Sequence, residues 1–339
     1  MRKLNGSYAI EVLNGRLNGS SDKVENNTSG YKNATFTKKI GGRSKISTPC
    51  QKMNIRKFMS AMSGTSQESR IKDGKQIKML PDPFKNEIDD ILGFMQAEKV
   101  IIEKEDYELL DENKKKLFSK SKNVYQANIT KKRKARLQMN ALVNVSTNKV
   151  KWEWNVASST TDSMPYQQEV YSGVHTSIFN IDIDEIGKFT VSNLASEFRD
   201  YSEEEGLDVI DLTAEERYVR IDNVLNAIEH LSISSNQTNH LTDTKPKFVI
   251  LADYSWGNNA FQGIFKENGV DIEMLRECIE QNEKYRVSNI YIGVNKFFDN
   301  KYNNIKQELE EEFKEYDFIK ISNVKTAFEN YKEELKINI

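Results

Sequence analysis

The sequence predicts an α+β fold built on a ferredoxin-like split β-α-β scaffold with antiparallel strands and a large insertion. Three observations lead to this prediction. A β-branched segment near the N-terminus is followed by a helical pattern that ends near residue 60. Residues from about 60 to 165 then interrupt the scaffold with loops and runs of charge. The second half of the chain returns to alternating strand and helix patterns, as a conventional α/β core does.

The first elements are a strand, a long polar loop and a helix. Residues 7–13 are short, β-branched and partly alternating, which predicts the first strand. Residues 14–33 are rich in Asn, Gly and Ser, which predicts a loop. Thr48 is a favourable N-cap and Pro49 suits the first helical position. We therefore predict a helix over residues 49–62.

The insertion contains an acidic part and a basic part. Residues 81–117 are acidic and predict helical structure from four apolar residues at helical spacing: Ile88, Ile91, Leu92 and Met95. A basic cluster at residues 131–136 leads into an apolar segment at 137–145. Residues 146–148 favour a turn into residues 149–156, so this part predicts a β-hairpin with a basic approach.

The second half predicts the rest of the scaffold. The expected strands are residues 177–183, 247–253 and 290–294, and the expected helices are residues 215–231, 271–284, 303–315 and 323–336. RNA-recognition folds share this split β-α-β plan. The K/R-G-F/Y-G/A-F signature of an ordinary RNA-recognition motif does not occur, so base stacking on its usual sheet aromatics is not expected.

Composition indicates a hydrophilic globular protein. The chain has 339 residues, of which 37% are hydrophobic and 29% are charged. No apolar run approaches the roughly 20 residues that a membrane span needs, and polar residues follow Met1, so we expect no membrane segment or signal peptide. Cys50 and Cys278 are the only cysteines, too few for a disulfide framework or a cysteine-based zinc site. We therefore expect a cytoplasmic location.

Charge is distributed unevenly around a net value of −2. Residues 1–57 carry twelve Lys or Arg and three Asp or Glu, and residues 114–151 carry twelve Lys or Arg and no acid. Residues 58–113 have a net charge of −6 and residues 152–339 one of −17. Basic segments set against acidic ones indicate a surface that binds a polyanion, and we interpret this as nucleic acid. The alternative is a solvated charged face.

The junction at residues 41–58, GGRSKISTPCQKMNIRKF, predicts a phosphate site. A helix N-terminus offers free backbone N–H groups and the positive end of its dipole, which suit a phosphate. The flanking hydroxyls and cations are Ser44, Ser47, Thr48, Arg43, Lys45, Lys52 and Arg56. Gly41 and Gly42 allow a backbone to approach closely. Such contacts hold a sugar–phosphate chain without reading its sequence. An ordinary capped surface helix is the alternative.

The usual signatures of an enzyme are missing. The glycine pair lacks the third glycine and the Lys-Ser/Thr of phosphate-binding loops, and no Gly-x-Ser-x-Gly elbow occurs. The three histidines have no metal-ligand spacing: His175, His230 and His240. Asp182, Asp184 and Glu185 could imitate a metal-binding cluster, but an outward strand face that runs into a turn explains them better. We predict no catalytic residue, no metal and no cofactor.

Several segments, in order, resemble a known family. Leu17-Asn18, Lys38-Lys-Ile-Gly-Gly-Arg43 and Ile46-Ser-x-x-x-x-Lys52-x-x-x-Arg56 resemble the N-terminal pattern of CRISPR backbone subunits. These are the crRNA-binding proteins of type I Cascade complexes, in the RAMP superfamily. Residues 168–172, 179–187, 220–231 and 246–251 resemble the DevR-type, type I-B branch. The chain therefore resembles a crRNA-binding backbone subunit of type I-B Cascade over residues 8 to about 260.

The resemblance implies a modified RRM palm with an inserted helical domain and a projecting β-hairpin. The implied division is 1–60 for the first part of the palm, 61–118 for the helical domain, 119–165 for the basic hairpin insertion, and 166–339 for the second part with C-terminal helices. Such subunits are not enzymes. They assemble as a helical filament along one crRNA, hold its backbone, and leave the bases free to pair with target DNA.

The resemblance also implies partners and contact residues. The partners are the crRNA, the target DNA strand paired to it, further copies of the chain, and the large, small and crRNA-end-capping subunits, with no membrane. Carried over by position, the guide contacts are Asn18, Lys39, Arg43, Lys45, Ser47, Gln51, Lys52 and Arg56. The basic approach adds Lys131, Arg133, Lys134 and Arg136, which contact RNA or the adjacent subunit. Asn236 and Gln237 belong to the loop where the family usually has glycines.

Two other functions remain open from the residues alone. One is an endonuclease like the type III backbone subunits, which would cleave target RNA with Asp22 as its catalytic acid. The other is a stand-alone RNA-binding regulator. The chain also departs from the family at Pro49, where Gln or Ala is frequent.

Overall fold

The computed structural model describes residues 2–20, 34–63, 70–73, 76–79, 81–110, 112–116, 118–122, 124–147, 150–158, 163–189, 211–235 and 237–339. The chain forms two compact units. The first comprises Met1–Gly64, Leu137–Ile186 and Ala214–Ile339, and the second comprises Thr65–Arg136 and Gly187–Thr213. Both units contain helices and strands, which confirms the predicted α+β class. The domain boundaries expected after residues 60, 118 and 165 stay a prediction.

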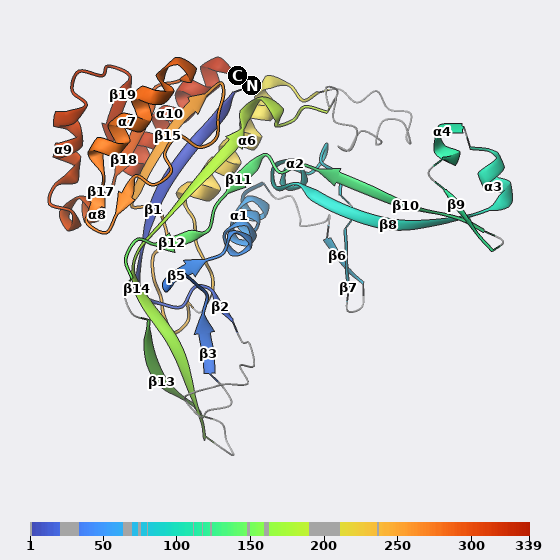
Figure 1. Cartoon of the computed structure of the whole chain (residues 1–339), viewed down its shortest axis with the longest axis horizontal. Helices are drawn as coiled ribbons and strands as arrows, with labels where there is room; N and C mark the ends of the chain where they lie inside the picture. The colour runs from blue at the N-terminus through green and yellow to red at the C-terminus, as the bar shows by residue number, and fades with distance from the viewer. Residues whose placement is uncertain are drawn as a thin grey trace. The chain divides into compact units, whose positions relative to one another are not determined.

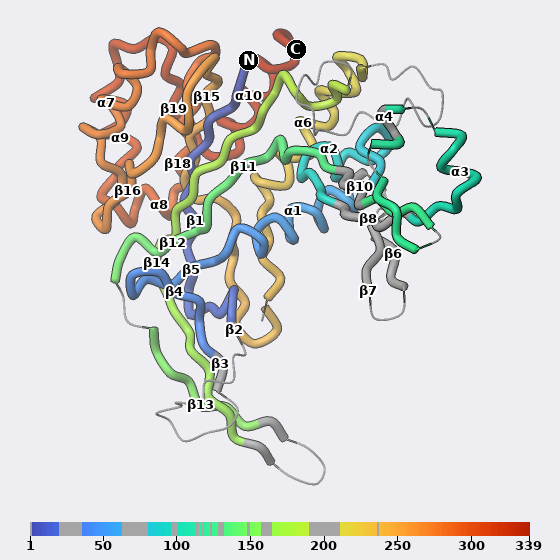
Figure 2. Tube along the Cα trace, turned by 45° about the vertical axis from the view of Figure 1, so that its right-hand side comes forward, coloured from blue at the N-terminus to red at the C-terminus, as the bar shows by residue number. Residues whose placement is uncertain are grey.

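A large sheet organises the first unit. Strand β1 (Lys3–Gly15) pairs antiparallel with β14 (Ser163–Asp182) on one side and with β15 (Phe248–Tyr254) on the other. Figure 2 shows β1 and β14 running side by side. Further strands extend the sheet beyond β15 and β14: β18 (Ile290–Val294), β19 (Ile319–Ser322), β12 (Leu142–Asn144), β5 (Arg43–Ile46) and β4 (Lys39–Ile40).

Strand β14 also has partners outside this row. Its other neighbours are β11 (Leu137–Met139), β13 (Lys151–Ser158) and β3 (Ala34–Thr37), which in turn pairs with β2 (Gly19–Ser20).

The hairpin predicted from residues 137–145 and 149–156 is wrong. Leu137 and Leu142 are fully buried, because β11 and β12 pair with β14 inside the sheet. The hairpin that extends from the sheet is made of β13 and the first part of β14 (Figure 1).

Helices cover the sheet at β15 and β18, where every side chain is buried. Phe248, Ile250, Ala252 and Tyr254 belong to the cluster that α7 (Ile272–Asn282), α8 (Lys296–Lys301) and α9 (Ile305–Glu312) complete. On the other face, α10 (Val324–Asn338) packs on β15 and β18 and also contacts α6 (Ala214–Glu229), which contacts α1 (Thr48–Ser63). Small elements complete the unit: 3-10 turns Ile183–Glu185 and Glu283–Tyr285, β16 (Phe265–Lys266) and β17 (Gly269–Val270).

These elements confirm most of the scaffold predicted from the sequence. The strands expected at 7–13, 247–253 and 290–294 are β1, β15 and β18, and the strand at 177–183 is the end of β14. The expected helices correspond to α1, α6, α7, α9 and α10. Helix α8 and strand β19 were not predicted, because each is short and carries little periodic signal.

The second unit contains more strand than its sequence suggested. Its elements are β6 (Arg70–Asp73), β7 (Gln76–Met79), α2 (Glu87–Leu92), β8 (Phe94–Glu103), α3 (Lys104–Glu108), α4 (Glu112–Lys115), β9 (Ser119–Ser121) and β10 (Val124–Arg133). The helical structure predicted over 81–117 is wrong from residue 94 to 103, which form β8. Gly93, with a φ of 68°, ends α2. The β-branched run of β8 then pairs along its length with β10.

A buried histidine links β14 to β5 within the first unit. Ser44 Oγ donates to His175 Nε2 at 2.9 Å, and His175 Nδ1 donates to the Gly173 carbonyl at 3.1 Å. Asn144 Nδ2 also reaches Ser44 Oγ, at 3.3 Å. Burial lowers the pKa of His175 from 6.5 to about 4, so the ring is neutral at pH 7. This neutral tautomer holds the strand that carries the two cations discussed below.

We expect the close contact of Gly6 with Phe179 to make Gly6→Ala destabilising. Gly6 faces Phe179 across the β1–β14 ladder, and a Cβ at Gly6 would overlap the Phe179 ring. Overpacking of this kind costs about 1–3 kcal/mol of unfolding free energy. Urea unfolding of Gly6→Ala, Phe179→Leu and the double variant measures it. The double variant should be more stable than the sum of the single losses implies, whereas additive losses would contradict the contact.

We expect stability to fall on acidification through His175. Its folded pKa, about 4, lies below the unfolded value of 6.5, so the stabilisation is complete above 6.5 and is lost progressively towards 4. The loss between pH 7 and pH 5 should be roughly 2 kcal/mol of unfolding free energy. Urea unfolding at both pH values, compared with His175→Gln, isolates it. An equal pH dependence in the two proteins would refute the assignment.

Candidate nucleic-acid interface

A two-residue turn joins β4 to β5 at the glycine pair. Ile40 pairs with Arg43, and the intervening Gly41 and Gly42 have φ values of 54° and 77°. Positive φ at both central positions is the geometry of a type I′ hairpin turn, which glycine adopts without a steric penalty. The glycines therefore shape a tight hairpin that returns the chain directly into the cation-bearing strand.

Strand β5 places its two cations on one face. Ser44 and Ile46 are buried, while Arg43 and Lys45 are partly exposed. Alternate residues of a strand share a face, and two residues span about 7 Å. Neither side chain forms an ion pair within the described part of the chain. The backbone N–H of Lys45 donates to the Lys38 carbonyl at 2.9 Å, which fixes the strand next to the β4 hairpin. Two adjacent cations are therefore available to an anion.

The start of α1 differs from the sequence prediction. Gln51 N–H donates to the Ser47 carbonyl at 3.1 Å, so Ser47 occupies the N-cap position that we had assigned to Thr48. The Thr48 hydroxyl instead donates to the Met139 carbonyl at 3.4 Å. The Ser47 N–H donates to Asn18 Oδ1 at 2.9 Å, and Pro49 has no N–H. Asn18 therefore positions the helix start and uses a donor that was expected to face a phosphate.

Three residues of α1 that were predicted to contact RNA are instead buried or bonded within the protein. The Gln51 carboxamide is fully buried: it accepts from the Tyr8 hydroxyl and donates to the carbonyls of Asn140, at 3.0 Å, and Ile46, at 3.4 Å. Lys52 Nζ donates to the Leu137 carbonyl at 2.8 Å, and burial followed by the charge of Arg56 lowers the pKa of Lys52. Arg56 is buried as well. Because Gln51 and Arg56 are buried, their side chains cannot contact a polyanion directly. The ammonium group of Lys52 already donates a hydrogen bond to the Leu137 carbonyl.

Lys39 is held by a carboxylate. Its Nζ lies 2.7 Å from Glu169 Oε1, and the Thr37 N–H donates to Glu169 Oε2 at 2.7 Å. Glu169 is buried on β14, so the ion pair ties β4 to the central sheet. Lys39 therefore has a structural partner and contributes less free charge than its sequence position suggested.

Two of the four predicted contacts in the basic cluster of the second unit are buried. Arg133 is buried in an ion pair with Asp90 and lies 4.6 Å from the centre of the Phe189 ring. Arg136 is buried, and its backbone N–H donates to the Ile91 carbonyl at 2.8 Å. Both arginines stabilise their own unit, so the prediction that they contact RNA does not fit. Lys134 is exposed, and Lys131 is described only by its place in β10.

Two other predicted groups have limited descriptions. Gln237 Nε2 donates to the Ile233 carbonyl at 2.7 Å, and its Oε1 accepts from the Thr242 N–H at 2.8 Å, so this carboxamide closes its own loop. Asn236 and Asp22 lie outside the described residues. The contact role of Asn236 and the catalytic alternative at Asp22 stay predictions.

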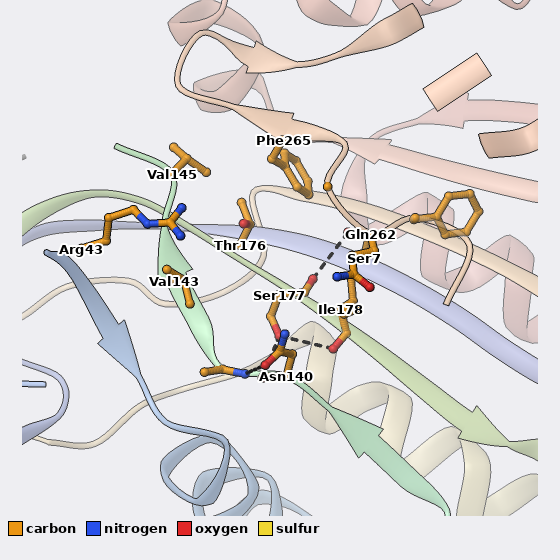
Figure 3. A pocket seen from close by; sticks show the side chains of 13 residues that line it. Ser7, Arg43, Asn140, Val143, Val145, Thr176, Ser177, Ile178, Gln262 and Phe265 are labelled. Carbon is orange, nitrogen blue, oxygen red and sulfur yellow. Dashed lines mark hydrogen bonds between the residues drawn. The ribbon is translucent and has the colours of Figure 1, made fainter. Parts of the chain in front are cut away.

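A pocket of about 270 Å³ lies beside Arg43 (Figure 3). Its polar lining comes from β1, β14 and the loop after β15, and includes Ser7, Thr176, Ser177 and Gln262. Thr176 and Gln262 were not among the residues predicted from the sequence. The alternation of half-buried Thr176 with buried His175 and Ser177 was an available signal, whereas nothing local marked Gln262.

The described residues contain no group of three or more His, Cys, Asp or Glu side chains that could hold a metal ion. Asp182 accepts from Gln138 Nε2 at 3.0 Å, and Asp184 accepts from the Arg2 N–H at 2.6 Å. These two acids therefore serve the end of β14 and the turn that follows. No helix among the described residues has the length and apolarity to cross a membrane.

Solved structures that are similar to this chain include the following two. A chain titled "CRISPR RNA-guided surveillance complex" has a TM-score of 0.46 and 12% identity, with 83% of each chain covered. Another, "CRISPR RNA-guided surveillance complex, pre-nicking", has a TM-score of 0.45 and 11% identity, with 83% of this chain and 88% of the other covered. No curated protein matches the sequence.

The sequence itself matches a family model described as "CRISPR-associated negative auto-regulator DevR/Csa2". The match covers residues 34–267, more than two thirds of the chain. It spans the β4–β5 hairpin, α1, the second unit, β14 and α6. The expected resemblance to the DevR-type branch is thereby confirmed, and the chain belongs to the CRISPR-associated DevR/Csa2 family.

Proposed function

We propose that this protein is a non-catalytic backbone subunit that binds crRNA in a type I-B CRISPR interference complex. In this proposal, copies of the chain assemble along one crRNA, which then pairs with invading DNA. Membership in a CRISPR-associated family and the basic character of residues 1–57 support it. Its further partners would be the large, small and crRNA-end-capping subunits.

The observation that carries the proposal is the free cation pair on β5. Arg43 and Lys45 share a face of β5, and no carboxylate among the described residues neutralises them. Contacts to phosphates need cations without internal partners, because a paired cation must first lose its carboxylate. Arg56, Arg133 and Arg136 are buried and are left out of the proposed interface. Asn18 and Ser47 remain as its positioning elements, and Lys39 as peripheral charge. Exposed Lys134 belongs to the second unit and stays a separate proposed contact.

The strand order supports an RRM-like palm. Within the first unit, β15, β1, β14, β12 and β5 follow one another as antiparallel neighbours. An internal β1 flanked by two antiparallel strands, with α1 and α6 packed together, fits a split β-α-β arrangement. We infer that residues 1–60 and 166–339 form most of this palm.

The β13–β14 hairpin fits the projecting element of the proposal. β13 presents Trp152, Trp154 and Val156 at alternate positions, and all three are exposed. Exposed apolar groups at alternate positions form a stripe, which favours contact with another macromolecule. We propose that this hairpin meets a neighbouring copy or the guide, in place of the basic hairpin expected from the sequence.

We expect the double variant Arg43→Ala, Lys45→Ala to weaken RNA binding and reduce its salt dependence. Each lost contact to a single strand lowers the slope of log K against log salt by about 0.7, so two contacts lower it by about 1.4. Fluorescence anisotropy with a labelled guide RNA at several salt concentrations measures this slope. The change should leave the fold intact, because both side chains lie at the surface of β5.

A matched control removes two exposed lysines of the C-terminal acidic part, Lys314→Ala and Lys320→Ala. This control changes net charge equally and should keep the wild-type slope. If both double variants reduce the slope alike, the effect reports net charge, and the assignment of β5 fails. Variants of Lys52 or Arg56 would not serve, since their burial couples RNA binding to folding.

The family description, which names a negative auto-regulator, favours a second candidate, a regulator that controls its own expression. The two functions predict different bound nucleic acids. We expect the chain, expressed with its neighbouring genes and purified, to carry guide RNAs with a repeat-derived end and to copurify with other subunits. Sequencing of the bound nucleic acid decides between them. Recovery of the protein alone with its own transcript or upstream DNA would favour the regulator.

A further inference from the structure

Three adjoining pockets form a trough on the first unit. The pocket of about 270 Å³ beside Arg43 shares Asn140, Ile178 and Gln262 with a second pocket of about 330 Å³. The second shares Asn258 with a third of about 400 Å³, which Lys3 and Trp256 also line. We define the trough by six residues: Arg43, Thr176, Gln262, Asn258, Trp256 and Lys3. Along β1 it reaches from Ser7 to Lys3, about 14 Å at the usual rise per residue.

Several polar groups of the trough have no internal use. Within the described part of the chain, the Arg43 guanidinium, the Thr176 hydroxyl and the carboxamides of Gln262 and Asn258 form no side-chain hydrogen bond. Asn259 is the contrast: its Nδ2 donates to the carbonyls of Gly6, at 3.0 Å, and Phe179, at 2.9 Å. The Asn259 amide therefore stabilises the fold, whereas the amides of Asn258 and Gln262 can bind a ligand. Free polar groups that converge on a concave surface indicate a binding site.

An exposed aromatic ring lies at the far end of the trough. Trp256 is 71% exposed and lies two residues after Tyr254, the buried end of β15. Gly257, with a φ of 97°, turns the chain after it towards Asn258. An indole next to free amides can stack on a planar ring while the amides bind the edge of that ring. This combination is suited to a nucleobase.

We propose that the trough binds unpaired nucleobases of RNA, with Trp256 as a stacking platform and Gln262 and Asn258 as edge-binding amides. The proposal rests on the proposed RNA-binding function and adds a base-dependent contact to the backbone contacts on β5. Arg43, at the near end of the trough, would connect the base contacts to the backbone contacts on β5. It would hold the phosphate of the RNA where the RNA leaves the trough. Carboxamides offer both a donor and an acceptor, so they can pair with base edges.

The lining favours bases over other ligands. Only Arg43 and Lys3 supply positive charge among the residues that line the three pockets. Lys3 is already 3.7 Å from Asp182, so a continuous track for phosphates is absent from this lining. The walls combine amides and hydroxyls with apolar side chains such as Val143, Phe265 and Met139. A mixed lining of this kind suits a ligand that has an apolar planar face and a polar edge.

The test compares two fluorescein-labelled 12-nucleotide RNAs of equal charge, one with mixed bases and one with abasic ribose. Full-length wild type should bind the base-bearing RNA about tenfold more tightly, because stacking and edge contacts act only on bases. Trp256→Ala and Gln262→Ala should each lower this ratio about three- to tenfold and leave binding of the abasic strand unchanged. Phe297→Ala on α8 and Gln307→Ala on α9, both exposed and outside the trough, should behave as wild type.

A crosslink gives an independent readout. RNA that carries 5-iodouridine should attach to the peptide containing residues 255–262 in wild type, as mapped by mass spectrometry. If wild type binds both RNAs equally and the trough variants match it, the trough proposal is overturned while RNA binding stands. If wild type binds neither RNA, the proposed function fails, and the trough proposal fails with it. If the variants instead dissociate copies of the chain in sedimentation, the trough is a protein interface and the proposal is overturned.

Discussion

The buried carboxamide of Gln51 is the interaction on which the candidate interface depends. It joins α1 to β1 through the Tyr8 hydroxyl, to the end of β5 through Ile46, and to the β11–β12 link through Asn140. Any of these polar groups left buried without a partner would cost about 1–3 kcal/mol, so the arrangement is strongly specified. Its consequence is the orientation of β5: with Ile46 held inward, Ser44 also points inward, and Arg43 and Lys45 take the remaining face.

The predictable part of the fold was the part with local periodicity. The strands that became β1, β15 and β18 and the helices that became α1, α6 and α10 each showed their pattern within one segment. The hairpin and the acidic helix failed because their pairing is long-range. Residues 137–144 resemble a hairpin arm but bind β14, which begins about twenty residues later. Residues 94–103 have apolar residues at helical spacing, yet Gly93 and the partner strand β10 make them a strand.

The sequence predicted where the candidate interface lies, but it did not predict which residues belong to it. The glycine pair and the neighbouring cations marked this location in the sequence, but we interpreted the glycines only as allowing close backbone approach. The turn and the two-faced strand that follows it are seen only in the structure. Sequence alone could not separate free cations from paired ones. Arg133 lies beside exposed Lys134 in a basic run, but its partner Asp90 is 43 residues away. Gln51 was predicted as an RNA contact because it is polar, but its amide is buried and forms hydrogen bonds inside the protein.

The surface that can hold an anion, on β4 and β5, is separate from helix α1, which supports it. Hydrogen–deuterium exchange of the protein with and without guide RNA tests this separation most directly. We predict slower exchange on RNA binding in peptides that cover residues 38–47, and unchanged exchange in peptides that cover residues 50–60 of α1. Protection on α1 without protection of the β4–β5 hairpin would contradict the account.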